Sequence, residues 1–160
     1  MVVRSSSTTQ SQTPAQLRRD LHATVADKLD AAEQRYTSRR RALVDLLADA
    51  GRPVSIADIA RLGPNLPRSS AYRNLVDLEA AGVVRRVAAN DEFARYELAE
   101  DLTEHHHHLV CLGCGTVEDL SPPASLERSV ARAIERLADQ DGFTVQSHRL
   151  DLLGLCSACS

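Results

Sequence analysis

The chain's four cysteines fall into two Cys-x-x-Cys pairs, and this constrains the fold more than any other feature of the sequence. Cys111 and Cys114 form the first pair, Cys156 and Cys159 form the second, and no cysteine is left over. One such turn lets two thiolates reach a single ion, and two turns complete a closed, tetrahedral zinc site. The spacing therefore predicts a structural zinc ion that joins the chain's end to the segment near residue 111. A redox pair and an iron–sulfur cluster are the alternatives.

Four consecutive histidines, His105 to His108, lie in mid-chain just before the first cysteine pair. The apolar Leu-Val that follows predicts a strand, on which side chains alternate between two faces. His106 and His108 would face one way, and His105 and His107 the other, so two metal sites could lie back to back. Each face needs further ligands, for which the candidates are Glu97, Glu100, Asp101, Glu104, Glu118, Asp119, Glu127 and His148. A polar strand without metal is the alternative.

Charge is divided unevenly along the chain. Residues 1–90 carry 14 Lys and Arg against nine Asp and Glu, whereas residues 91–160 carry five against 13. A basic part suits the phosphates of nucleic acid, and an acidic part with His and Cys suits cations. Residues 1–14 are rich in Ser, Thr and Gln, which predicts a disordered tail and not a signal peptide. With no apolar run long enough for a bilayer, we expect a cytoplasmic protein without membrane contact.

The basic part has apolar residues at helical spacing, followed by two alternating segments. The expected elements are helices over 14–32, from Thr37 to Gly51, from a capping box at Ser55 and Asp58 to Leu62, and from a Ser69 cap to Ala81 with Gly82 closing it, then strands over 83–87 and 93–98 around a polar turn at 89–92. Three short helices and a hairpin predict a winged helix-turn-helix.

In such a domain the helix after the turn lies in the major groove, and its first residues reach base edges. Here these residues are Arg68, Ser69, Ser70, Tyr72 and Arg73. Arginine pairs with guanine through two hydrogen bonds, and a tyrosine ring can pack on a thymine methyl group. Periodicity alone leaves open a scaffold helix that binds nothing.

The acidic part predicts a small α+β unit. A strand ends near 118–121, Pro122-Pro123 breaks it, a helix carries Leu126, Val130, Ile134 and Leu137, and a strand over 143–155 leads to the second cysteine pair. So few strands leave exposed edges, which pairing with a second copy would cover. The expected α+β chain thus comprises a disordered tail (1–14), a winged-helix DNA-binding domain (15–99), a hinge (100–104) and a metal-binding dimerisation domain (105–160).

Together these motifs resemble the ferric uptake regulator (Fur) family of metal-dependent transcriptional repressors. The strings that carry the resemblance are His105–Gly115 for the central signature, Ser70–Leu75 and Leu78–Val83 for the recognition helix and the entry to the wing, and Tyr36–Arg39 for the start of the first winged-helix helix. The resemblance covers residues 17–159. It implies an N-terminal winged helix, a C-terminal dimerisation domain and a homodimer that binds palindromic operators in double-stranded DNA when metal is bound.

The resemblance also implies roles for individual residues. It implies a structural zinc site at Cys111, Cys114, Cys156 and Cys159, a regulatory hinge site at Glu97, His106, His108 and Asp119, a second site in the dimerisation domain at His105, His107, Glu127 and His148, DNA contacts by Tyr72 and Arg73, and a minor-groove contact by Arg35. Many members complete the hinge site with a His where this chain has Arg52-Pro53. The linker before the His run is also longer than usual, so Glu100, Asp101 or Glu104 could replace a standard ligand. Ligands of this kind suit regulatory iron(II) or zinc, with manganese or nickel possible.

The predicted function is a metal-responsive repressor of metal homeostasis genes, neither an enzyme nor a binder of small organic substrates. Metal at the hinge would bridge the two domains and favour operator binding by linkage. One alternative is a peroxide sensor of the same family, in which peroxide, activated by bound iron(II), oxidises a ligand histidine. Another is a metal-buffering protein. A zinc deaminase is excluded because the chain has no His-x-Glu and neither cysteine pair follows a proline.

Overall fold

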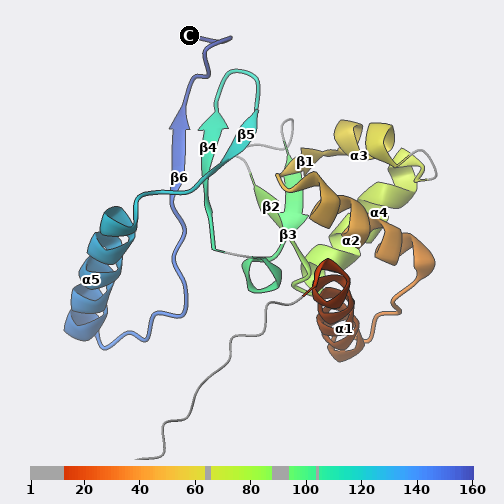
Figure 1. The fold of residues 1–160 in the computed structure, drawn as a ribbon, viewed down its shortest axis with the longest axis horizontal. Coiled ribbons are helices and arrows are strands. Elements are labelled where there is room, and N and C mark those ends of the chain that lie inside the picture. The colour runs from red at the N-terminus through yellow and green to blue at the C-terminus, as the bar shows by residue number, and fades with distance from the viewer. Residues whose placement is uncertain (1–12, 64–65, 88–93, 104) are drawn as a thin grey trace, which may run out of the picture.

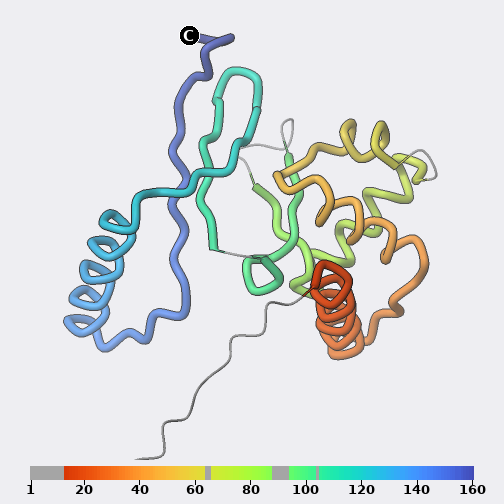
Figure 2. Tube along the Cα trace, viewed as in Figure 1, coloured from red at the N-terminus to blue at the C-terminus, as the bar shows by residue number. Residues whose placement is uncertain are grey.

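The computed structural model describes residues 13–63, 66–87, 94–103 and 105–160, which form two small sheets and their helices (Figure 1). In chain order the elements are α1 (Pro14–Ala31), α2 (Ser38–Ala50), β1 (Val54–Ser55), α3 (Ile56–Leu62), α4 (Arg68–Ala80), β2 (Val84–Val87), β3 (Arg95–Leu98), the 3-10 helix η2 (Glu100–Leu102), β4 (His107–Cys111), β5 (Val117–Leu120), α5 (Ala124–Asp141) and β6 (Asp151–Gly154). The tube in Figure 2 shows α1–α4 at one end of the molecule and α5 at the other. The expected α+β class is confirmed.

The first two helices begin and end where short-range chemistry predicts. The Thr13 side chain accepts a hydrogen bond from the Gln16 N–H, and proline occupies the first helical position of α1. The tail predicted over 1–14 falls mostly on residues 1–12, which lie outside the described part, and α1 begins at Pro14, as the predicted helix over 14–32 does. Thr37 caps α2, and Gly51 ends it in the left-handed conformation with φ +57°.

Helix α3 begins with the predicted capping box. The Ser55 hydroxyl accepts from the Asp58 N–H at 3.1 Å, and the Asp58 carboxylate accepts from the Ser55 N–H at 3.0 Å. Burial by itself raises the pKa of Asp58, but the bonds from Ser55 and Arg61 outweigh it and lower that pKa to about 2. Ionised Asp58 therefore stabilises the fold above its ordinary pKa, and that contribution disappears as the pH falls towards 2.

An Asp58→Asn variant is expected to lose about 1–2 kcal/mol of unfolding free energy at pH 7, because the ionised half of the capping box is gone. Urea denaturation measures the loss, and its difference from the native chain should shrink below pH 4. Asp27→Asn, an exposed position on α1, is the matched control. A difference from the native chain that stays constant down to pH 3 would contradict the pKa assignment.

Helix α4 starts two residues earlier than predicted. It begins at Arg68 behind Pro67, which has φ −54° and makes no side-chain cap bond, so Ser69 lies inside the first turn and the predicted Ser69 cap is wrong. The ring of Pro67 already holds the backbone angle that a helix entry needs. At the other end Gly82 has φ +67°, and the Val83 N–H reaches the Leu78 carbonyl at 2.8 Å, which is a Schellman-type end.

The N-terminal core is aliphatic and joins all four helices to the first sheet. Its members include Val25, Leu29, Leu43, Val44, Leu47, Ile59, Ala71, Leu75 and Leu78, with Val54, Val84, Tyr96 and Leu98 from the strands. The predicted hairpin forms between β2 and β3, while its turn at 89–92 lies outside the described residues. The sequence did not predict β1, which pairs with the other edge of β3 and gives the strand order β1-β3-β2.

The second sheet has the order β5-β4-β6, with β4 antiparallel to β5 and parallel to β6. The strand predicted over 143–155 is wrong for most of its length, because only Asp151–Gly154 is strand. Its partner β4 is five residues long, and the pairing runs only from His108 opposite Asp151 to Cys111 opposite Gly154. No residue of helix α5 is fully buried within this chain; of its predicted apolar stripe, Val130 and Ile134 are half-buried, whereas Leu126 and Leu137 are exposed.

Candidate metal centres and nucleic-acid interface

The four cysteines meet at one end of the second sheet, and we call them the cysteine cluster. Their sulfur atoms all lie within 4.8 Å of one another, and Cys114 Sγ is 3.8 Å from Cys156 Sγ. Four sulfurs at about 2.3 Å from a tetrahedral zinc ion lie about 3.8 Å apart, whereas a disulfide needs about 2.05 Å. All four are free thiols, so their arrangement fits a four-sulfur ion site.

The electrostatics of the cysteine cluster also favour a cation. Backbone N–H groups of Cys114, Cys156 and Gly113 point at Cys111 Sγ and lower the pKa of its thiol to about 6. Hydrogen bonding to Cys156, Cys114 and Cys111 raises the pKa of Cys159 to about 12. Four thiols this close to one another cannot all ionise unless a positive charge lies between them. A Cβ at Gly113 would come within 3.0 Å of the Cys159 Cβ, so glycine permits the close approach.

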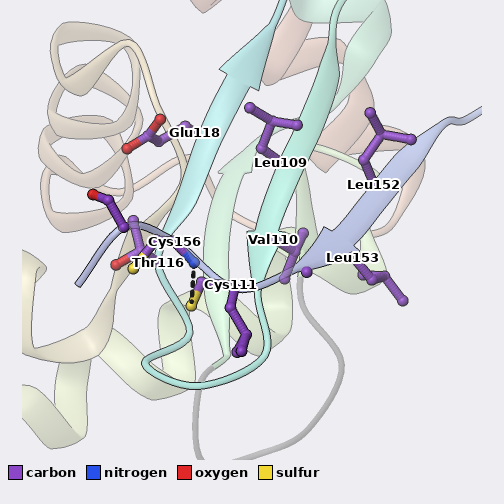
Figure 3. A pocket seen from close by; sticks show the side chains of 11 residues that line it. Leu109, Val110, Cys111, Thr116, Glu118, Leu152, Leu153 and Cys156 are labelled. Carbon is purple, nitrogen blue, oxygen red and sulfur yellow. Dashed lines mark hydrogen bonds between the residues drawn. The ribbon is translucent and has the colours of Figure 1, made fainter. Parts of the chain in front are cut away.

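Beside the cysteine cluster the second sheet carries an apolar hollow of about 320 Å³. Figure 3 shows Leu109 and Val110 of β4 and Leu152 and Leu153 of β6 around it, with the bond from the Cys156 N–H to Cys111 Sγ drawn dashed. Leu152 and Leu153 are 46% and 59% exposed. An exposed apolar surface of this kind on a short sheet is typical of an interface.

A second group, which we call the hinge cluster, comprises Glu97, His106, His108 and Asp119. Glu97 comes from β3 of the first sheet, while the other three come from β4, β5 and the segment just before β4. Glu97 Oε2 lies 3.2 Å from His106 Nε2 and 3.2 Å from His108 Nε2. One ligand atom from each of the four residues falls within 4.8 Å of the others. The structure thus brings the four together where the two sheets meet.

Two residues that the sequence analysis missed contact members of the hinge cluster. Asp151 Oδ1 lies 3.1 Å from His108 Nδ1, an arrangement that leaves Nε2 as the ligand atom when Nδ1 donates. The Arg85 guanidinium on β2 bonds the Glu97 carboxylate. Burial opposes ionisation of Glu97, but the hydrogen bond from His108 and the charge of Arg85 prevail and lower its pKa. Neither residue has a signal in the sequence, because both are placed by cross-strand register.

The third group, which we call the second cluster, comprises His105, His107, Glu127 and His148. Glu127 in the first turn of α5 places Oε1 2.6 Å from His107 Nε2, and Oε2 3.4 Å from His148 Nε2. His148 Nε2 is buried and makes no hydrogen bond among the described residues. A buried ring nitrogen without a hydrogen bond, beside a carboxylate, suits a metal ligand.

None of the remaining carboxylate candidates among the described residues belongs to the three ligand groups, although Glu100 contacts one member. Glu100 bonds His105 Nδ1, Asp101 pairs with Lys28 at 2.7 Å, and Glu118 lies on β5 opposite Leu109. Glu104 lies outside the described residues. Arg52 stands where many family members have a histidine ligand. It lines a second hollow together with Glu97, His106 and Asp119, and its guanidinium lies 4.0 Å from the Asp58 carboxylate.

The candidate DNA-reading side chains lie on an open surface. Arg68, Ser69, Tyr72 and Arg73 of α4 are exposed, as is Arg35 before α2, and Ser70 is half-buried. Behind them the buried Arg40 donates to the Arg35 carbonyl at 2.7 Å, to Asn74 Oδ1 at 3.3 Å and to Asp77. Arg40, which the sequence analysis missed, therefore fixes the Arg35 segment against α4. Within the described residues no helix has the length and apolarity to cross a bilayer.

Comparison with known proteins gives one consistent result. The model of the ferric uptake regulator family matches residues 31–153. The chain is 28% identical to the ferric uptake regulation protein of Bacillus subtilis, over 85% of this chain and 92% of that protein. It is 29% identical to the peroxide operon regulator of B. subtilis, over 79% and 84%. The structure of the Helicobacter pylori ferric uptake regulator is similar with a TM-score of 0.66 at 21% identity, over 89% of this chain and 93% of that one.

Proposed function

The chain belongs to the ferric uptake regulator family, and from that membership we propose that it represses genes of metal homeostasis by binding a palindromic operator as a homodimer. The family's members are metal-responsive transcription regulators and not enzymes. This chain is likewise a metal-responsive transcription regulator and not an enzyme. One observation carries the proposal: a single carboxylate oxygen of Glu97, on the wing, faces the imidazoles of both His106 and His108 on the other sheet. Ligands from both sheets can thus meet at one ion.

The residues present fit the metals that the family implies. The cysteine cluster would hold a structural zinc ion, and the hinge cluster would hold the regulatory ion, iron(II) or zinc, with manganese or nickel as further possibilities. The bound ion would supply positive charge to two carboxylates held close together. Glu97 moves with the winged helix over 15–99, and His106, His108 and Asp119 move with the unit over 105–160. Holding all four at one point fixes the angle between the two units across the hinge at 100–104.

A fixed angle is what operator recognition by a dimer requires, because both recognition helices must meet half-sites on one duplex. By linkage, DNA must then tighten metal binding by the same factor by which metal tightens DNA binding. The second cluster would be a further site. The H. pylori relative is described as having three functional metal binding sites, and the described residues of this chain include three groups of side chains that could each hold an ion.

The homodimer would form through the second sheet and α5. Helix α5 presents exposed apolar side chains at Leu126 and Leu137. Leu152 and Leu153 of β6, and Leu155 just after it, are also exposed and line the hollow of Figure 3. A second copy of the same surface is the simplest cover, because a two-fold axis makes one patch complementary to itself. The family's placement in the cytoplasm, where thiols stay reduced, suits the cysteine cluster.

A DNA-binding titration tests the proposal. The full chain with its structural zinc is mixed with an inverted-repeat duplex selected from random DNA, under anaerobic, chelator-buffered iron(II), zinc, manganese or nickel. At least one metal should tighten binding about 5- to 150-fold and leave binding to a scrambled duplex unchanged. Equal affinity with and without every metal would refute a metal-responsive repressor, and failure to prefer any inverted repeat would favour a metal-buffering protein.

An Arg73→Ala variant is expected to lose about 1–3 kcal/mol of operator binding and to relax preference at one base position, because a bidentate guanine contact is removed. Competition binding with operators substituted at single positions measures both effects. Arg132→Ala, an exposed arginine on α5, is the matched control and should bind like the native chain. A uniform loss across all operator sequences would assign Arg73 to the phosphate backbone instead.

Similarity to the peroxide operon regulator supports a second candidate function. In that reading, iron(II) in the hinge cluster would react with peroxide, and a ligand histidine would gain an oxygen atom. Mass spectrometry of the peptide that contains His105–His108, after peroxide treatment of the iron-loaded protein, separates the two. A histidine whose mass rises by about 16 Da, the mass of one oxygen atom, would favour the peroxide sensor.

A further inference from the structure

Arg85 occupies a position beside the hinge cluster that the roles proposed above do not use. It lies on β2 directly opposite Glu97 on β3, so both side chains project from the same face of the sheet. Its Nε donates to Glu97 Oε1, and the Arg85 and Glu97 side chains are only 15% and 8% exposed. A guanidinium so withdrawn from water must be compensated by a nearby negative charge, and Glu97 supplies it.

The same guanidinium extends to a second ligand. Arg85 Nη2 lies 3.4 Å from His106 Nε2, and its Nη1 lies 4.0 Å from Glu100. Arginine has only donors, so it bonds His106 Nε2 in the tautomer in which Nε2 carries the lone pair and Nδ1 carries the proton. The lone pair on Nε2 is also what a metal ion would use. Arg85 therefore approaches one carboxylate and one imidazole that the hinge cluster would offer to metal.

The charges of the cluster give this contact a consequence. Two ionised carboxylates, Glu97 and Asp119, with two neutral imidazoles carry a charge of −2, which a divalent ion balances. The positive charge of Arg85 against Glu97 offsets one of these two charges, so the ion would enter beside a fixed like charge. Asp151 and Glu100 lie outside the four ligands and add the same negative charge with or without Arg85. Because the contact is nearly buried, water screens this repulsion poorly.

From this geometry we infer that Arg85 is a built-in competitor of the regulatory metal, which holds Glu97 in the metal-free protein and sets the metal concentration at which the hinge cluster fills. The inference rests on the proposed function, because it takes the hinge cluster as the regulatory site. It assigns Arg85 to tuning metal affinity and not to ligation. The chain would thus respond at a higher free metal concentration than the same four ligands would alone.

The test measures binding of Mn²⁺ to the full chain with its structural zinc, from the electron paramagnetic resonance signal of free Mn²⁺. A His148→Ala background disables the second cluster. In that background Arg85→Gln should bind Mn²⁺ about tenfold to a hundredfold more tightly, the effect of one unit charge several ångströms away. Without metal, its melting temperature should fall, because Glu97 stays buried without its counter-ion.

Two matched variants make the result specific. Arg85→Lys keeps the charge and should bind Mn²⁺ within about threefold of the parent, since charge is the property in question. Arg86→Gln removes a charge from the next residue of β2, whose side chain projects from the opposite face, and should leave Mn²⁺ affinity unchanged. Circular dichroism confirms that each variant is folded.

The outcomes separate the inference from the function beneath it. If the parent chain binds no Mn²⁺, the hinge site itself is wrong, and the inference falls with it. If the parent binds Mn²⁺ but Arg85→Gln binds it equally or more weakly, the proposed function stands. Arg85 then merely positions Glu97, and the competitor role is overturned. Equal tightening in Arg85→Lys and Arg85→Gln would also overturn it, because charge would not be the cause.

Discussion

A Cys156→Ser variant should lose its zinc ion and, with it, the folded second sheet and the dimer. A hydroxyl is a far poorer zinc ligand than a thiolate, and the three remaining sulfurs leave the ion open to solvent and chelators. Structural zinc contributes on the order of 10 kcal/mol to the folding of small zinc domains. Little else holds this end of the chain, because β6 is exposed along its whole length and α5 buries no residue.

Three measurements check the prediction. Metal analysis should find about one zinc ion per native chain and almost none in the variant, sedimentation should show loss of the dimer, and operator binding should fall below detection. Ser157→Ala changes the exposed residue between the same two cysteines and should behave like the native chain. Zinc retained in Cys156→Ser with native affinity would contradict the four-sulfur site, and a disulfide in the native chain under reducing conditions would do the same.

The double variant His106→Ala/His108→Ala should lose the metal response of operator binding while keeping its metal-free affinity. In the proposed site the two imidazoles would join Glu97 on the first sheet and Asp119 on the second through the metal ion, and alanine provides no ligand. The factor by which metal tightens DNA binding, expected to be about 5- to 150-fold in the native chain, should fall to about one. Fluorescence anisotropy of a labelled operator, with and without metal, gives this ratio directly.

The second cluster provides the control for that experiment. His105→Ala/His148→Ala removes the same number of imidazoles from the other side of the strand that carries the histidines, so a general loss of stability would appear in both double variants. If only the hinge variant loses the response, the switch lies at the hinge cluster. If the hinge variant still switches fully with metal, the proposed link between the two units is wrong.

Features governed by neighbouring residues could be predicted from the sequence. The caps at Thr37 and Ser55, the glycine that ends α2 and the buried stripe of α4 are confirmed, because each depends on residues within one or two helical turns. Pairing of the two Cys-x-x-Cys turns was predictable because four-sulfur coordination has few alternatives. The alternation of the histidines agrees with the two groups that the structure brings together.

What could not be predicted depends on contacts between distant segments. The pairing of β1 with β3 and the shortness of β6 follow from the partners available to each strand, which no local pattern specifies. Asp151 faces His108, and Arg85 faces Glu97, through register alone. The network of Arg40 is similar, because it joins a loop to the middle of α4. Each of these residues looked like an ordinary surface charge in the sequence.

The histidine run itself is ambiguous about which ring serves which ion. If β4 slipped by one residue, His105 and His107 would turn towards Glu97, and His106 and His108 towards Glu127, so each side would still find two imidazoles. The neighbours of the run remove this degeneracy. Val110 is 5% exposed and Leu109 is 40% exposed, so a slip would bury the wrong apolar side chain and carry Cys111 away from the other three sulfurs. The cysteine cluster thus fixes the register of β4. The proposed structural ion, although it takes no part in the metal response, would in this way determine which histidines face the regulatory site.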